Sequence, residues 1–470
     1  MKRGKDDGVL LVSPPFTSFY RGVPIRQGVP YSPTLSLPTV AAGLIRRGFG
    51  TSILDGNLYN DPLAAVTDAV RQREPDWVGI SVVTPLWNEV LAIVEAVRQT
   101  SARTRIVLGG PHVSAMPRES LQESGADAIV IGEGDETLAD LVAAAEPAAV
   151  PGAAVRLPGG DIVFGPERPC VTDLDSLPLP AWELYDLRRY HTTELLSRKS
   201  PAGWIETSRG CPFGCVYCSK HTFGRNFRAK SPGRVVDEMA AMLAHGFKEI
   251  HIADDCFSFK PDRVRGICEE ILRRNMSFPW APVTGIRVDN LDVELLRLMR
   301  RAGCYRVYFG IESGSDEILK RVKKGISLDK VRHAVLASRE AGLETFGFFM
   351  IALPGETEET MRQTRRFARE LDLDMAKISI TIPLPGTALY QEIEREGRLL
   401  TKHWSEYNLY RPARTVYQHD TLDWDVIEKH YRLFYRSFYL RPGYALRRLR
   451  YALRNRTLLT DLRALFHTDW

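Results

Sequence analysis

The chain has 470 residues and a net charge of +5, and its composition is 44% hydrophobic and 26% charged. This length and balance predict a globular protein of two or three domains with extensive apolar cores. No run of about 18 uncharged apolar residues occurs, so we predict no membrane-spanning helix. The N-terminus lacks the apolar segment of a signal peptide, and seven scattered cysteines do not suggest a disulfide framework. Both features predict a cytoplasmic protein.

Over residues 1–145, short apolar runs alternate with helical patterns such as 38–47 and 88–98. Strand–helix alternation of this kind predicts an α/β domain with a flavodoxin-like, doubly wound parallel sheet, which binds ligands at the carboxyl ends of its strands. The runs that we predict as buried strands are Val9–Val12, Thr51–Leu54, Trp77–Val83, Arg105–Leu108 and Ala128–Ile131.

Small and polar residues stand at the carboxyl ends of these strands, where they let a ligand approach the backbone closely. No G-x-G-x-x-G follows the first strand, so a nicotinamide or flavin dinucleotide is not predicted there. The candidate ligand-binding residues are Pro14, Asp55, Asn57, Thr84, Gly109, Gly110, Gly132, Glu133 and Gly134.

Residues 146–200 are rich in Pro, Ala and Gly, and we predict that they form a linker. A second strand–helix series follows over 201–400 and predicts a partial (β/α)6 barrel, open on one side, with its chemistry at the carboxyl-terminal rim. Residues 401–470 are predicted to form a small helical region. The six barrel strands are predicted to end near Ser208, Asp254, Arg287, Glu312, Ala352 and Ile382.

Cys211, Cys215 and Cys218 follow the first barrel strand in C-x3-C-x2-C spacing. Three thiolates can hold three irons of a [4Fe–4S] cluster and leave the fourth iron open, whereas electron-transfer clusters usually have four protein ligands. The alternative is a zinc site completed by His221. Structural zinc sites usually begin with C-x2-C or C-x4-C and close with a second, distant pair, so the spacing favours the cluster.

This spacing, with the aromatic Tyr217 directly before the last cysteine, resembles the signature of the radical S-adenosylmethionine (SAM) superfamily. The resemblance implies that the open iron binds the amino and carboxylate groups of SAM. Residues 11–15, 109–115 and 131–137 resemble the cobalamin-binding domain that precedes many radical SAM barrels. Together the two resemblances cover about residues 8–390, and they imply that the candidate residues of the N-terminal domain contact cobalamin.

For the barrel, the resemblance implies that several strand ends contact SAM. The family's usual Gly-Gly-Glu is absent after the second strand, where two aspartates stand instead. Arg287 has two interpretations, a forked pair with the SAM carboxylate or a salt bridge at the rim to Asp289 or Glu312. The candidate SAM-binding residues are Tyr217, Asp254, Asp255, Arg287, Glu312 and Ser313.

Cobalamin proteins of the mutase type carry Asp-x-His-x-x-Gly after the first strand, and that His ligates cobalt. Here residues 13–20 read Ser-Pro-Pro-Phe-Thr-Ser-Phe-Tyr, without a His. His112 follows the fourth strand instead. We therefore expect that no protein His holds the lower face of cobalamin, and that His112 is a satisfied loop residue.

The resemblance implies an enzyme in which the reduced cluster cleaves SAM to a 5′-deoxyadenosyl radical and methylcobalamin methylates an unactivated carbon of a small-molecule or lipid-like substrate. Such an enzyme needs an external low-potential electron donor, and no nucleic-acid partner is expected. The alternative is an oxidative cyclase or a ring-rearranging enzyme, such as the anaerobic magnesium-protoporphyrin cyclase. A tRNA methylthiotransferase would carry further cysteines in the N-terminal domain, but none precedes Cys170. A non-catalytic carrier would not need six strand-end motifs.

The stretch from 431 to 460 contains eight Arg and no acid, interleaved with aromatic residues. A basic and aromatic helix is typical of peripheral contact with an anionic membrane, which we predict for 431–456. The alternative is a terminal helical hairpin that packs on the protein itself.

Overall fold

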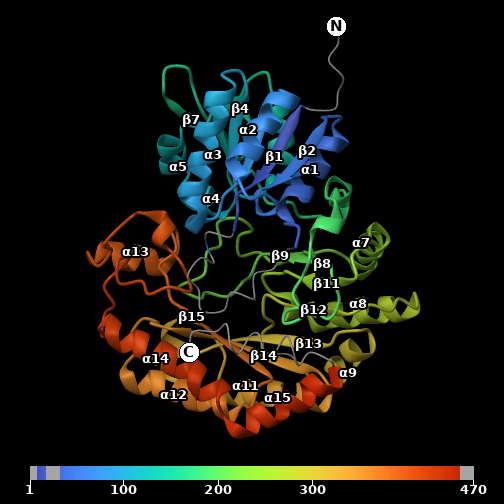
Figure 1. Cartoon of the computed structure of the whole chain (residues 1–470), viewed down its shortest axis with the longest axis vertical. Helices are drawn as coiled ribbons and strands as arrows, with labels where there is room; N and C mark the ends of the chain where they lie inside the picture. Colours follow the sequence, from blue (N-terminus) through green and yellow to red (C-terminus); the bar gives the residue numbers. More distant parts are fainter. Residues whose placement is uncertain (1–7, 17–18, 20–31, 290, 456–470) are drawn as a thin grey trace.

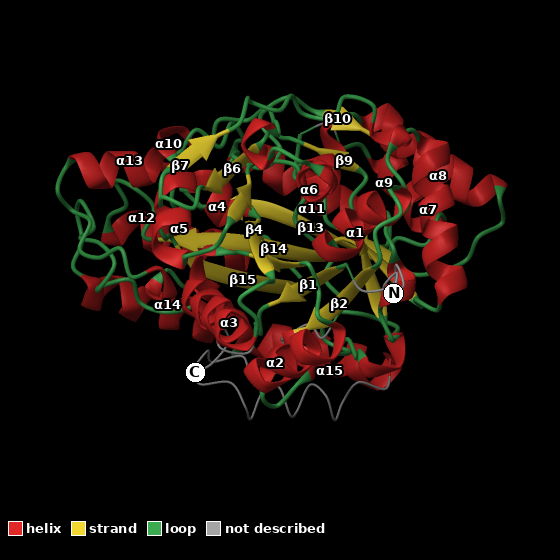
Figure 2. Ribbon diagram, turned by 90° about the horizontal axis from the view of Figure 1, so that it is seen from above, coloured by secondary structure: helices red, strands yellow, loops and turns green. Residues whose placement is uncertain are grey.

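The computed structural model describes residues 8–16, 19, 32–289 and 291–455. An N-terminal α/β domain lies above a second domain built around six parallel strands (Figure 1). Seen from above, the N-terminal sheet covers the strands of the second domain (Figure 2). The carboxyl-terminal loops of the two domains therefore meet between them.

Seven strands form the N-terminal sheet, in the order β2-β1-β3-β4-β5-β6-β7. The first five are parallel and lie where the sequence predicts them, which confirms a doubly wound α/β domain. The last two are antiparallel and extend the sheet into the segment predicted as a linker. The strands are β1 Val9–Ser13, β2 Thr51–Asp55, β3 Trp77–Ser81, β4 Arg105–Gly109, β5 Ala128–Val130, β6 Ala153–Arg156 and β7 Ile162–Phe164.

Both faces of this sheet are covered because its strands alternate buried side chains on the two sides. Val9 and Leu11 of β1 pack with helices α1 and α6, whereas Leu10 and Val12 pack with α2, α3 and α5. The helices are α1 Ser36–Arg46, α2 Pro62–Arg73, α3 Trp87–Thr100, α4 Pro111–Ala115, α5 Pro117–Ser124 and α6 Gly134–Ala143.

The second domain contains two three-stranded parallel sheets, β12-β11-β8 and β13-β14-β15. Parallel bridges from Trp280 to Cys304 and from Ile286 to Phe309 join them into one open barrel, as predicted. Two short antiparallel strands, β9 Ser208–Arg209 and β10 Arg228–Ala229, flank the cysteine loop. The barrel strands are β8 Ala202–Ile205, β11 Glu249–Ile252, β12 Trp280–Pro282, β13 Arg306–Glu312, β14 Glu344–Ile351 and β15 Met375–Ile380.

Helices cover the outer face of the barrel (Figure 1). Their apolar residues pack against the outward-facing side chains of the strands in one continuous core. The helices are α7 Pro232–His245, α8 Pro261–Arg273, α9 Val293–Arg301, α10 Asp316–Arg321, α11 Leu328–Glu340, α12 Glu358–Glu370, α13 Ala388–Arg395, α14 Trp424–Tyr439 and α15 Pro442–Asn455.

The aromatic residues of α14 pack against the barrel. Phe434 and Phe438 are buried, and the Tyr435 hydroxyl donates to the carbonyl of Ile378 in β15 at 3.0 Å. The Tyr439 hydroxyl donates to the carbonyl of Ala376 at 2.6 Å. None of the helices in the described ranges is long and apolar enough to cross a membrane.

Candidate active site

The three cysteines of the predicted cluster lie on one loop between β9 and β10, at the barrel rim. Cys211 is buried, Cys215 is partly buried and Cys218 is exposed, with the Lys220 ammonium 3.2 Å from the Cys218 sulfur. A hydrogen bond with the Cys256 thiol lowers the pKa of Cys211 to about 5, which favours the thiolate that binds iron. In the described part of the chain, no three His, Cys, Asp or Glu side chains converge on a metal position. Three thiols on one rim loop are nevertheless the donor set that a [4Fe–4S] cluster requires.

Tyr217 gives this loop an unsatisfied polar atom. Its hydroxyl is buried and has no nitrogen or oxygen partner among the described residues, while Cys215 and Glu312 lie near it. The flanking Val216 donates its backbone N–H to the carbonyl of Val322 at 3.2 Å, which fixes the loop on the barrel. An orphaned buried hydroxyl beside the thiols fits a bound ligand with polar groups, as SAM is.

The two aspartates after β11 have different surroundings. Asp254 is buried, and its carboxylate accepts hydrogen bonds from the Thr207 N–H at 2.5 Å, the Thr207 hydroxyl at 2.5 Å and the Ser208 hydroxyl at 2.6 Å. It therefore fixes the backbone that leads into the cysteine loop. Asp255 is exposed and accepts one hydrogen bond, from the Gly210 N–H at 3.2 Å. Of the two predicted SAM contacts, Asp255 is the carboxylate with acceptor capacity left for a ligand.

Arg287 forms a salt bridge with Asp289, which was one of the two interpretations of this residue from the sequence. Its Nε donates to Asp289 Oδ2 at 2.9 Å, and its other nitrogens donate to the carbonyls of Lys324 and Gly325 at 2.9 and 3.0 Å. The guanidinium also stacks on Phe213 of the cysteine loop, 3.5 Å from the ring centroid. In this arrangement Arg287 supports the cysteine loop, and its guanidinium nitrogens already donate to groups of the protein.

Glu312 and Ser313 lie at the end of β13 and point to different neighbours. The Glu312 carboxylate is 2.6 Å from the Lys324 ammonium, and its backbone has a φ of 66°, which is unfavourable for a residue with a side chain. Ala352, at the end of β14, has a similar φ of 62°. Such strain is typical of functional rims. Ser313 is fully buried against the Thr364 hydroxyl, so it contacts helix α12 here.

In the N-terminal domain, two of the predicted ligand residues fix the first loop. The buried Asp55 carboxylate accepts from the Asn57 N–H at 3.0 Å and from the Tyr190 hydroxyl at 2.9 Å. The Asn57 side-chain oxygen in turn accepts the Phe16 N–H at 2.6 Å. Pro14 lies beside them and is buried. These contacts fix the backbone at the end of β1 as far as Phe16.

The glycines at the strand ends differ in the space around them. A Cβ on Gly110, which has a φ of 123°, would lie 2.6 Å from the carbonyl oxygen of Val82, so the fold itself requires glycine there. A Cβ on Gly109 would meet no described atom closer than 3.9 Å. A Cβ on Gly132 would lie 3.7 Å from the carbonyl oxygen of Thr222 in the cysteine loop, and a Cβ on Gly134 would lie 3.1 Å from Val40. At Gly109 and Gly132 a Cβ would thus make only ordinary van der Waals contacts, although Gly132 has a φ of 78° that favours glycine.

His112 is enclosed by aromatic rings. It is 1% exposed, its Nδ1 lies 3.2 Å from the Thr84 hydroxyl, and its ring packs between Trp87 and Trp404 at centroid distances of 4.8 and 5.3 Å. Burial lowers the pKa of His112 to about 4, so the imidazole is neutral at pH 7. His112 thus has a partner within the protein, as expected, but it lies in helix α4 and not in a loop.

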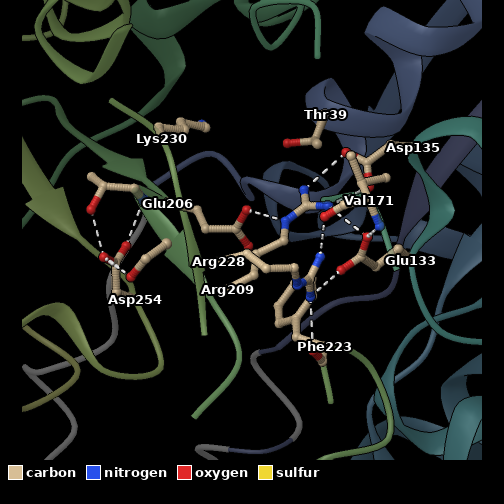
Figure 3. A network of polar contacts seen from close by, with 12 residues as sticks. Thr39, Glu133, Asp135, Val171, Glu206, Arg209, Phe223, Arg228, Lys230 and Asp254 are labelled. Carbon is tan, nitrogen blue, oxygen red and sulfur yellow. Dashed lines mark hydrogen bonds and ion pairs between the residues drawn. The ribbon is translucent and has the colours of Figure 1, made fainter. Parts of the chain in front are cut away.

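A buried ionic network at the two strands that flank the cysteine loop joins the two domains (Figure 3). Arg209 of β9 binds both carboxylate oxygens of Asp135 at 2.8 and 2.9 Å and donates to Glu206 at 2.6 Å. Arg228 of β10 pairs with Glu133 at 2.6 Å, and Arg209 lies 3.4 Å from the same carboxylate. We call these five residues the interdomain clamp. Glu133, predicted as a ligand contact, is engaged here by two arginines.

Sequence reasoning did not find the clamp, because Glu133 and Asp135 lie more than 70 residues before the two arginines. The available signal was Arg209 itself, an arginine two residues before the first cysteine in a segment expected to be buried. Buried arginines are almost always paired, so a partner in the other domain could have been sought.

His221, the fourth ligand of the zinc alternative, is engaged elsewhere. Its Nε2 lies 2.8 Å from the carbonyl oxygen of Gly386, on the loop after β15. That contact joins the end of the cysteine loop to the last barrel strand, as the clamp joins its beginning to the N-terminal domain.

The geometry agrees with two family descriptions. Residues 205–368 match the radical SAM superfamily, and residues 28–142 match the B12 binding domain. An uncharacterized methyltransferase of Pyrococcus horikoshii, PH0819, is 32% identical over 441 residues, which is 92% of this chain and 93% of that protein. The chain therefore belongs to the radical SAM superfamily and carries an N-terminal B12 binding domain.

The chain is also similar to a cyclase in sequence and to a solved methyltransferase in fold. The anaerobic magnesium-protoporphyrin IX monomethyl ester cyclase of Rubrivivax gelatinosus is 27% identical over 416 residues, covering 86% of this chain and 73% of the cyclase. The radical SAM methyltransferase TsrM of Kitasatospora setae, solved with cobalamin and a [4Fe–4S] cluster bound, has the same fold, with a TM-score of 0.67 at 23% identity over 83% of this chain and 74% of TsrM. The protein is thus a radical SAM enzyme of the cobalamin-dependent kind, with a [4Fe–4S] cluster, SAM and cobalamin as cofactors.

Proposed function

We propose that this enzyme transfers a methyl group to an unactivated carbon of a small-molecule substrate. The observation that carries the proposal is the placement of the cysteine loop, held by the clamp against the B12 binding domain at residues 133–135. A bound cluster with SAM would supply a carbon radical there, and bound cobalamin would supply the methyl group.

In this proposal the chain's own residues bind, orient and exclude water. Cys211, Cys215 and Cys218 ligate the cluster, and the Tyr217 hydroxyl and the Asp255 carboxylate are the polar groups with unused capacity beside it. The backbone at the β4 and β5 ends, where Gly109 and Gly132 carry no side chain, would lie against cobalamin. The aromatic enclosure of His112 supports a cobalt whose lower face is free of protein His.

Enclosure between two domains suits radical chemistry, because a carbon radical is quenched by stray hydrogen donors unless water is excluded. The buried clamp keeps the two domains closed on one side of the site. An external low-potential electron donor must still reach the cluster. Seven free cysteines and a reducible cluster suit the cytoplasm.

Similarity to the magnesium-protoporphyrin cyclase over most of this chain favours a second candidate function, oxidative cyclisation with the same cofactors. The two functions differ in the fate of the SAM methyl group. Methylation transfers it to the substrate, whereas cyclisation leaves the substrate's carbon count unchanged.

Anaerobically reconstituted enzyme, supplied with a reductant and SAM carrying a labelled methyl group, tests the proposal without knowledge of the substrate. We expect 5′-deoxyadenosine to form and the label to be recovered on the enzyme-bound cobalamin. Formation of 5′-deoxyadenosine with no label on cobalamin would favour the cyclase. Absence of both products would contradict radical SAM chemistry in this chain.

The proposal also includes a lipid-like substrate and the membrane contact predicted for 431–456. Packing accounts for the aromatic residues, since Tyr435 and Tyr439 bond to β15. The remaining exposed apolar side chains on α15 are Leu446, Leu449 and Leu453, with exposed fractions of 51%, 45% and 61%. Co-sedimentation of the full chain with anionic and with neutral vesicles tests whether this stripe contacts lipid.

A further inference from the structure

Lys377 of β15 lies on the inner face of the barrel. In the register of β14 and β15 it pairs with Phe348, while the neighbouring Met375 pairs with Phe346. Side chains two residues apart in a strand share a face, so Lys377 lies on the side of Met375 and opposite Ile378, which packs outward toward α14. The lysine thus projects into the barrel interior.

An aromatic wall stands beside it. The ring of Tyr308 stacks on Phe346 at 4.8 Å and on Phe348 at 5.8 Å, with interplanar angles of 23° and 26°. These three side chains form a cluster on the inner face, separate from the apolar core between the strands and the outer helices. They offer a flat apolar surface at the level of Lys377.

The charge of Lys377 has no counter-ion among the described residues. Its ammonium donates to the Tyr410 hydroxyl at 2.7 Å and lies 4.2 Å from the centre of that ring. No carboxylate of the described ranges pairs with it, and burial alone lowers its pKa to about 8. By contrast, the inward-facing Lys324 and Arg306 are paired with Glu312 and Glu344 at 2.6 and 2.8 Å.

Tyr410 places this lysine at the mouth that faces the N-terminal domain. The Ile380 N–H at the end of β15 donates to the carbonyl of Leu409 at 3.0 Å. Tyr410 itself meets the ring of Phe19, from the N-terminal domain, at a centroid distance of 5.4 Å. Asn408 donates to the Phe19 carbonyl at 2.8 Å. Lys377 itself is partly exposed.

We propose that Lys377 and Tyr410 form a subsite that binds an anionic oxygen group of the substrate, a carboxylate or a phosphoryl group, while the substrate's apolar body lies on Tyr308, Phe346 and Phe348. A partly buried cation without a counter-ion is costly, and an anionic ligand offsets that cost with charge-assisted hydrogen bonds. The inference rests on the proposed function, because it assigns the barrel mouth to the substrate.

Ligand-observed fluorine NMR on the full-length, cofactor-loaded enzyme tests this subsite. The probes are 4-fluorobenzoate and 4-fluorophenylphosphonate, with neutral 4-fluorobenzamide for comparison. We expect one or both anions to bind the wild type, and to bind Lys377→Met about tenfold more weakly or worse, as loss of a charged hydrogen-bond donor predicts. Lys377→Arg should retain most of the binding. Lys402→Met, which removes the same charge from an exposed surface pair with Glu394, should not change it.

Tighter binding of the benzoate would indicate a substrate carboxylate, and tighter binding of the phosphonate would indicate a phosphoryl group. Either result supports the subsite. Equal binding of the anions to wild type and to Lys377→Met would overturn it, as would binding of the amide as tight as that of the anions. Lys377→Gln replaces the Met variant if circular dichroism shows the latter unfolded. Probe binding does not require SAM cleavage, so an enzyme that binds anions through Lys377 but forms no 5′-deoxyadenosine would refute the proposed function alone.

Discussion

At Glu356 a single carboxyl group is buried in the turn after β14. It is fully buried, and its side chain accepts the Leu353 N–H at 3.1 Å. Burial raises the pKa of Glu356 to about 8, so the acid is neutral in the folded protein at pH 7. In the unfolded chain the same group ionises near its ordinary value, about 4.3.

The sign of the resulting pH dependence follows from these two values. Because the folded-state pKa is raised, the stability that Glu356 contributes is present at pH 4 and is lost as the pH rises toward 8. We expect the urea midpoint of Glu356→Gln to exceed that of the wild type by a margin that grows between pH 5 and pH 8. A margin independent of pH would show that the carboxyl is ionised in the folded protein.

The two glycines after β4 make opposite predictions. Gly110→Ala places a Cβ against the Val82 carbonyl in a strained conformation, so it should destabilise the domain. Gly109→Ala makes only an ordinary van der Waals contact with Val130, at 3.9 Å, so it should leave the urea midpoint nearly unchanged while weakening cobalamin binding. Absorbance titration with cobalamin measures the second effect. Wild-type affinity in Gly109→Ala would remove this strand end from the cobalamin site.

At the scale of elements, helix α14 completes the outer face of β15. Phe434 is buried against Phe349, with ring centroids 5.2 Å apart, and Arg447 of α15 pairs with Asp372. A chain ending at residue 423 would lack Phe434 and would expose Phe349, whose burial contributes about 1.5–3 kcal/mol. We expect it to aggregate or to unfold at a lower temperature than the full chain, as followed by circular dichroism.

The outcome also separates packing from membrane binding. A truncated chain with an unchanged melting temperature but reduced sedimentation with anionic vesicles would assign α14 and α15 to the membrane. A chain ending at residue 455 is the matched control, because it retains both helices.

Most elements could be predicted from apolar runs, because buried parallel strands are nearly continuous in Val, Ile and Leu. The five parallel strands of the N-terminal sheet follow this rule, whereas barrel strands such as β12, Trp280–Pro282, do not. Strands β6 and β7 were not predicted, because they are four and three residues long and lie among Pro, Ala and Gly. The cysteine loop could be identified from spacing alone. The contacts of Asp254 and Arg287 could not, because they depend on which neighbours the barrel brings within reach.

At the scale of the whole molecule, the interdomain clamp holds the cysteine loop against the B12 binding domain. Arg209 is 3% exposed and engages Glu206, Asp135 and Glu133 together. Removing one member of a buried ionic network leaves the others unpaired, at a cost of about 3–5 kcal/mol. Burial raises the pKa of Glu206 to about 7 even with Arg209 beside it.

We therefore expect Arg209→Met to lower the free energy of unfolding by several kcal/mol, measured in urea. The control is Arg71→Met, which removes an exposed arginine paired with Asp68 on the surface and should change it by less than about 0.5 kcal/mol. Equal effects of the two substitutions would mean that the clamp does not hold the domains together.

The central claim is that Cys211, Cys215 and Cys218 hold a cluster that reductively cleaves SAM. Its most direct test is 5′-deoxyadenosine formation, with iron content measured in parallel, by anaerobically reconstituted wild type, Cys215→Ala and Cys170→Ala. Cys170 is an exposed free cysteine, which makes it the matched control. We predict that the wild type and Cys170→Ala bind about four irons and form 5′-deoxyadenosine, and that Cys215→Ala does neither. A Cys215→Ala enzyme that keeps its iron and still cleaves SAM would contradict the account.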